Sequence, residues 1–181
     1  MRRRTSRSVV VSFLLFSVCG LVTAALGAEV DRFAGEWRGA NIESNDGFEV
    51  AAKDLLLKLV PGDGGFELEW KAPGGAVEHA GFVASENQPG VFSAKASSGG
   101  LLGFFSSSEE VDPLEGDPLT WARLDGDAFI LYKLVIDERG AFTLDRYENT
   151  LQGETIRLRF TRRSHAESEQ ALVARLGRGG N

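Results

Sequence analysis

Hydrophobic and polar positions alternate most regularly between residues 119 and 163. Short apolar runs recur in this stretch and glycine-containing turns separate them, which is the pattern of antiparallel strands joined by hairpins. The predicted strands cover residues 119–124, 129–136, 141–150 and 155–162. Because one layer of hairpins leaves apolar side chains exposed, this meander needs a second layer of structure.

The chain before residue 97 continues the pattern. Residues 66–71 alternate strictly: Phe66, Leu68 and Trp70 point to one side, and charged residues point to the other. The apolar run that ends at residue 60 would also suit a buried helix, but the hairpin that follows favours a strand at 55–60. Further strands are predicted at 37–43, 77–84 and 90–96. The expected fold class is all-β, an antiparallel up-and-down β-barrel of about 8–10 strands, occupying residues 29–163.

Two segments break this rhythm. Residues 97–118 contain the apolar run Leu101-Leu102-Gly103-Phe104-Phe105 next to glycines. A connection this long suggests a lid over a cavity, a plug packed against the barrel, or a disordered insertion. In the tail, residues 164–181, Ser164 and Glu167 form a capping box and favour a short C-terminal helix. The alternative is a last barrel strand.

The first 28 residues have the layout of a signal peptide. Four arginines precede an apolar run at residues 9–22, and small residues follow it. Cleavage is expected before Ala28 or Glu29. A retained membrane anchor is the alternative, but this run is shorter than the roughly 20 residues that a spanning helix needs. The predicted location of the mature protein is therefore periplasmic or secreted, with no stable membrane insertion.

Removal of this segment changes the charge and the cysteine content. The four arginines leave, so the formal net charge moves from −6 to −10. The only cysteine, Cys19, also leaves, and the mature chain can form no internal disulfide. An acidic surface argues against binding to nucleic acid or to anionic lipid.

The stretch Phe33-Ala34-Gly35-Glu36-Trp37 follows the predicted signal peptide. It resembles the Phe-x-Gly-x-Trp sequence at the first strand of lipocalins and fatty-acid-binding proteins, the calycin group. The resemblance implies a lipocalin-like barrel in which a short lead-in caps one end and Trp37 packs across the floor. The Thr-Asp-Tyr sequence of lipocalins is absent. Trp37 also suits the role of an ordinary core aromatic. Otherwise the chain resembles small exported bacterial proteins.

The turn lengths predict which side chains share a face of the meander. If Trp121 lies opposite Ile130 and Tyr147 opposite Arg159, one face is amphipathic and the other is a dry core. The amphipathic face holds Trp121, Ile130, Tyr132, Leu134, Tyr147 and Arg159, with Asp145 and Arg157 near its edge. The dry face holds Phe129, Leu131, Val135, Phe142, Leu144, Ile156, Leu158 and Phe160.

The amphipathic face suggests a ligand site. An arginine and a tyrosine can hold a carboxylate while apolar walls hold a chain. The candidate ligand-binding residues are Trp37, Trp121, Tyr132, Tyr147 and Arg159. The face that stays outside must then be covered by the tail, by residues 97–118, or by a partner.

The sequence contains no recognisable catalytic motif. Its two histidines, His79 and His165, do not form a metal-ligand cluster with cysteines, and no phosphate-binding glycine loop is present. We expect no catalytic residues, metal site or cofactor. The favoured function is an exported barrel that binds or carries a small apolar, lipid-like ligand. The alternative is a non-enzymatic structural or interaction protein of the cell envelope with a filled barrel, acting as a homodimer or with an envelope protein partner.

Overall fold

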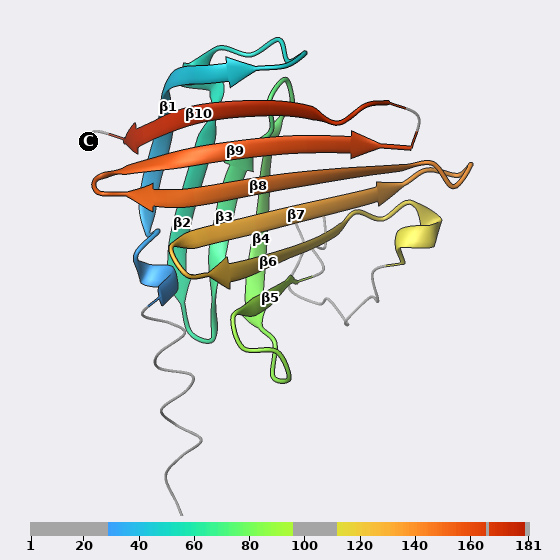
Figure 1. Ribbon diagram of the computed structural model, residues 1–181. Helices are drawn as coiled ribbons and strands as arrows, with labels where there is room; N and C mark the ends of the chain where they lie inside the picture. The colour runs from blue at the N-terminus through green and yellow to red at the C-terminus, as the bar shows by residue number, and fades with distance from the viewer. Residues whose placement is uncertain (1–28, 96–111, 166, 180–181) are drawn as a thin grey trace, which may run out of the picture.

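The computed structural model describes residues 29–95, 112–165 and 167–179. Ten antiparallel strands form a closed barrel in the order β1-β10-β9-β8-β7-β6-β5-β4-β3-β2 (Figure 1). The predicted all-β, up-and-down barrel is therefore confirmed. The strands are β1 (Gly35–Asn45), β2 (Leu56–Gly62), β3 (Gly65–Lys71), β4 (Val77–Ala84), β5 (Val91–Ala94), β6 (Leu119–Asp125), β7 (Ala128–Ile136), β8 (Phe142–Gln152), β9 (Thr155–Ser164) and β10 (Gln170–Arg178).

Two short 3₁₀ helices interrupt the connections. The first, η1 (Ala52–Asp54), precedes β2, and η2 (Pro113–Glu115) precedes β6. Most of residues 97–118, the predicted lid, plug or insertion, lies outside the described residues, as does the predicted signal peptide. No helix among the described residues has the length and apolar character needed to cross a membrane.

The C-terminal tail forms a strand, so the favoured helix is wrong. β10 pairs with β9 on one side and with β1 on the other, which closes the barrel. Leu172, Ala174 and Leu176 are fully buried, while Val173 and Arg175 face outward. Tertiary structure overrides the helix signals of the capping box and the helix-forming residues. As a strand, β10 satisfies the backbone hydrogen-bonding groups at the edges of two neighbouring strands at once.

The two ends of the barrel differ. At one end, the closed end, lie the tight β6–β7 and β8–β9 turns and the N-terminal lead-in (Figure 1). Phe33 and Trp37 are fully buried there, and the Trp37 indole N–H donates to the Phe33 carbonyl oxygen at 2.9 Å. The Arg178 guanidinium lies 4.2 Å from the centre of the Trp37 ring, a favourable cation–π contact. The opposite end, where residues 137–141 and 165–169 connect the strands, is the mouth.

Aromatic side chains fill the closed half. The Phe66 ring stacks on Phe82 with centroids 4.9 Å apart and meets Phe92 and Phe129 edge-on at 5.1 and 5.5 Å. All four rings are at most 3% exposed. Such contacts add specific geometry to a large apolar burial. The closed half is consequently a packed core.

The register of the meander differs from the prediction. Trp121 lies opposite Tyr132 and not Ile130, because the first turn is Gly126-Asp127 with Asp125 and Ala128 paired. Tyr147 lies opposite Phe160 and not Arg159, because Gln152 pairs with Thr155. In both turns the glycine takes a positive φ.

The loop between β7 and β8 causes a second difference from the prediction: the side chains of β8 point to the opposite faces of the sheet from those expected. It includes Ala141, whose backbone N–H donates to the Asp137 carboxylate at 2.9 Å, so β8 starts one residue later than expected. A shift of one residue turns a strand over. Tyr147 and Asp145 therefore face inward, whereas Phe142 and Leu144, assigned to the dry face, point outward opposite Ile136 and Leu134.

The alternation in β10 gives a test of its conformation. Leu172→Ala should lower the free energy of unfolding by about 3 kcal/mol, because it leaves a cavity in the core. Val173→Ala should cost about 1 kcal/mol or less. On a helix the two residues would share a face, so equal losses in urea denaturation would contradict the strand.

Candidate functional site

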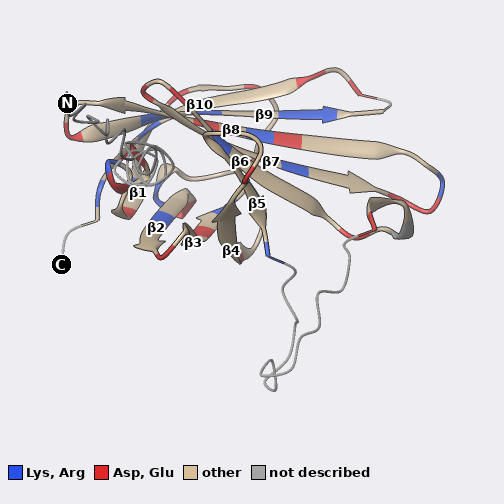
Figure 2. Ribbon diagram, turned by 90° about the horizontal axis from the view of Figure 1, so that it is seen from below, with Lys and Arg blue, Asp and Glu red and all other residues tan. Residues whose placement is uncertain are grey.

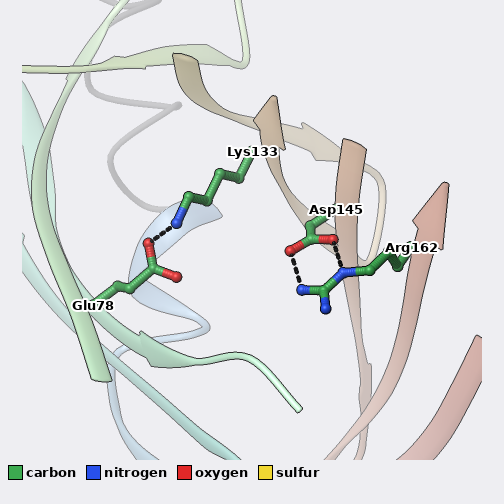
Figure 3. A network of polar contacts seen from close by, with 4 residues as sticks. All are labelled: Glu78, Lys133, Asp145 and Arg162. Carbon is green, nitrogen blue, oxygen red and sulfur yellow. Dashed lines mark hydrogen bonds and ion pairs between the residues drawn. The ribbon is translucent and has the colours of Figure 1, made fainter. Parts of the chain in front are cut away.

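Four charged side chains form a layer inside the barrel near the mouth. Lys133 on β7, Asp145 on β8 and Arg162 on β9 are consecutive partners across the sheet. Glu78 reaches toward them from β4, on the opposite wall (Figure 3). We call these four residues the charged layer. Charges inside a barrel are costly unless they are paired and hydrogen-bonded.

Asp145 and Arg162 form a bidentate pair. The Arg162 Nε and Nη2 atoms donate to the two Asp145 carboxylate oxygens, each at 2.7 Å. Asp145 is only 6% exposed, so its charge depends on this partner. The hydrogen bonds to Asp145 raise the pKa of Arg162 although burial opposes that shift. Both donor positions on this edge of the guanidinium are thereby occupied.

Lys133 and Glu78 form the second pair. The Lys133 ammonium donates to a Glu78 carboxylate oxygen, and this contact joins two walls of the barrel (Figure 3). Both side chains are partly exposed, at 20% and 29%. The layer therefore contains two cations and two anions, and each is paired with a neighbour of opposite sign.

Two polar atoms next to this layer lack partners. The Trp70 indole N–H and the Tyr147 hydroxyl are buried and accept or donate no hydrogen bond among the described residues. Burial raises the pKa of Tyr147 above its usual range, and the negative charges of Asp145 and Glu78 raise it further. The indole N–H of Trp70 is close enough to lower that pKa slightly, but its geometry falls short of a hydrogen bond.

A pocket of about 350 Å³ lies at the mouth, above the Asp145–Arg162 pair. Arg162, Thr143 and Ser164 line it from the inner face of β8 and β9, and Thr143 and Ser164 are cross-strand partners. The Ser164 hydroxyl is also buried without a partner in the described structure. Val135, Asp137, Ala141, Phe142, His165 and Glu167 complete the wall. We call this the mouth pocket.

Three of the predicted site residues lie on the outside of the barrel. Trp121 and Tyr132 stack there with ring centroids 4.9 Å apart, and the Arg146 guanidinium lies 6.0 Å from the Tyr132 ring. Arg159 is exposed on the outer face of β9. The tail does not cover this surface, because β10 lies between β9 and β1.

Arg157, placed near the edge of the predicted site, is also outside. It donates to Glu43 at 3.2 Å, and Arg175 donates to the same carboxylate at 3.0 Å. The hydrogen bonds from Arg175 and then Arg157 hold the pKa of Glu43 below its usual value. Lys and Arg residues are interspersed with Asp and Glu along the strands (Figure 2).

Only Trp37 and Tyr147 of the predicted site residues lie inside, and they belong to different levels of the barrel. Trp37 contributes to the closed end, whereas Tyr147 lies beside the charged layer. Sequence reasoning missed Trp70, Lys133 and Arg162. Strand alternation from Tyr147 does lead to Asp145, but which opposite charges meet across the interior depends on the register.

Comparisons with protein-family models, with curated protein sequences and with solved structures find no match to this chain. Within residues 29–95, 112–165 and 167–179, no three or more His, Cys, Asp or Glu residues gather in a way that would hold a metal ion.

Removal of Arg162 should expose the cost of a buried charge. Arg162→Met should lower the free energy of unfolding by about 3 kcal/mol, because it removes the bidentate partner of the buried Asp145 carboxylate. Arg163→Met is the matched control; its side chain is 63% exposed and pairs with Glu169 at the surface, so we expect a change below about 1 kcal/mol. Urea denaturation measures both. The double variant Asp145→Leu, Arg162→Met should recover stability, and a further loss would contradict this explanation.

The Tyr147 hydroxyl should lower the free energy of unfolding of the protein refolded from urea, because it is buried without a hydrogen-bond partner. Tyr147→Phe keeps the ring on Phe160, 4.8 Å away, and removes a dehydrated oxygen. We expect the free energy of unfolding to rise by about 1 kcal/mol. The outward Tyr132→Phe should change it by less than about 0.5 kcal/mol. A loss of stability in Tyr147→Phe would show that its hydroxyl is well hydrogen-bonded.

Proposed function

We propose that this chain is an exported barrel protein that binds a small, mostly apolar molecule at the mouth of its barrel. The mouth pocket carries the proposal, because the apolar side chains of Val135, Ala141 and Phe142 lie there among hydroxyl and charged groups, above a buried charged layer. Its volume falls within the range of about 300–1,000 Å³ that is typical of small-molecule sites.

The position of the pocket agrees with the packing of the barrel. Aromatic rings fill the closed half, so a ligand has room only toward the mouth. Val135 supplies apolar surface from the inner face and Phe142 from the rim, where it contacts His165. Thr143, Ser164 and Arg162 supply hydroxyl and guanidinium groups. Convergent polar groups of this kind fix the orientation of a ligand that is held mainly by apolar contact.

The relation to calycins is part of this proposal. A closed antiparallel barrel with the Phe33-x-Gly35-x-Trp37 sequence at its closed end supports it. Export is proposed from the layout of residues 1–28. The periplasm or the external medium would then be the place where the protein carries its ligand.

The second candidate is an interaction protein of the cell envelope. The packed closed half and the outward Trp121–Tyr132 stack favour it. Leu119, on the same outer face, is 38% exposed. A homodimer or a complex through this surface would bury the aromatic pair.

Filling the mouth pocket should separate the two candidates. Thr143→Trp places a large ring in the pocket, so it should abolish retention of a small molecule by protein purified from its own host. Thr161→Trp points outward from β9 and is the matched control. Native mass spectrometry measures the bound mass, and circular dichroism checks the fold.

The wild type and Thr161→Trp should carry the same added mass, and Thr143→Trp should carry none. A wild type that is bare, or that is purified as a dimer without ligand, would contradict ligand carriage. The same spectra give the chain mass and so show whether residues 1–28 have been removed.

A further inference from the structure

We propose that the ligand of the mouth site is uncharged and is recognised through a carbonyl oxygen, as in a ketone, ester or amide with an apolar chain. The carbonyl oxygen accepts hydrogen bonds from the Trp70 indole N–H and the Tyr147 hydroxyl. This inference rests on the proposed function and specifies the chemical class of the ligand.

The charge balance of the layer favours an uncharged ligand. In the described interior, each cation already has a carboxylate: Arg162 holds Asp145 through two bonds of 2.7 Å, and Lys133 holds Glu78. Arg159, which the sequence suggested for a ligand carboxylate, is on the outside. A carboxylate ligand would therefore lose its water without gaining an unpaired cation.

The electrostatic potential at the Tyr147 hydroxyl also disfavours an anionic ligand. At the Tyr147 hydroxyl, Asp145 and Glu78 both disfavour a negative charge, and each outweighs the opposing effect of Arg162. A carboxylate at the same point would meet the same two carboxylates. An uncharged acceptor avoids this repulsion and costs much less to desolvate.

The two free donors favour a ligand that carries a hydrogen-bond acceptor. The indole N–H of Trp70 can only donate, and the Tyr147 hydroxyl can donate its proton. Both residues are at most 4% exposed, and neither polar atom has a partner in the described structure. A carbonyl oxygen has two lone pairs and can accept from both, which would remove a cost that buried polar groups rarely carry.

The position of these donors connects them to the mouth pocket. Trp70 is the cross-strand partner of Glu78, and Tyr147 follows Asp145 by two positions on the inner face of β8. Both donors are therefore next to members of the charged layer. The Lys133–Glu78 pair keeps contact with solvent, at 20% and 29% exposure, so the layer is not sealed there. The polar end of the ligand passes beside this pair from the pocket to the donors, and both ion pairs stay formed.

Two probes of equal carbon number test the choice between uncharged and anionic ligands. Isothermal titration calorimetry of the full mature protein at pH 7 would measure 2-undecanone and undecanoate. We expect the ketone to bind at least about tenfold more tightly. Tyr147→Phe and Trp70→Phe should each weaken ketone binding by about fivefold, the effect of losing one hydrogen bond.

The outer aromatic pair supplies matched controls, since Tyr132→Phe and Trp121→Phe make the same changes outside the barrel. They should leave both affinities unchanged. Tighter binding of undecanoate, or ketone binding that is unaffected by Tyr147→Phe, would overturn the carbonyl assignment and leave ligand binding intact. If neither probe binds, the proposed function fails, and the assignment fails with it.

Discussion

Closure of the sheet by β10 is the constraint on which the rest of the structure depends. β10 pairs with β9 over eight positions from Gln170 to Gly177 and with β1 from the other side. Without it, β1 and β9 would be free edges with unpaired backbone groups. Because the barrel is closed, each strand has an inner and an outer face, and all inward side chains must fit one shared interior. Packing and charge pairing are both consequences of that limit.

The interior meets this limit in two different ways. Toward the closed end, Phe33, Trp37 and the cluster around Phe66 fill the space with rings. Toward the mouth, the inner face of the wall carries charged side chains. Those charges persist because Asp145 and Glu78 each meet a cation from another strand. The change from aromatic to ionic packing defines the level at which a ligand could be held, and Trp70 and Tyr147 lie at that boundary.

Much of the fold followed from local patterns. Strict alternation at Phe66, Leu68 and Trp70, and glycine turns such as Asp125-Gly126, located the strands to within a few residues. The site was harder to predict. Leaving Ala141 out of the β7–β8 loop exchanged the two faces of β8, so Tyr147 was grouped with Trp121 and Tyr132 although it lies on the opposite side of the wall from them. This error has a physical cause. Side chains alternate with a period of two along a strand, so one extra residue in a loop moves the side chains of the next strand to the opposite face.

By itself, the sequence determined that this chain forms antiparallel hairpins, that Trp37 belongs to an apolar core, and that the residues after position 28 carry excess negative charge. These properties arise from neighbouring residues and from composition. Only the tertiary structure decided that the tail is a strand and that Glu78 meets Lys133 across the interior. A helix-prone tail became β10 because the barrel offered it two edges to pair with. Partners separated by 55 positions are brought together by the curvature and register of the whole sheet, which no local pattern records.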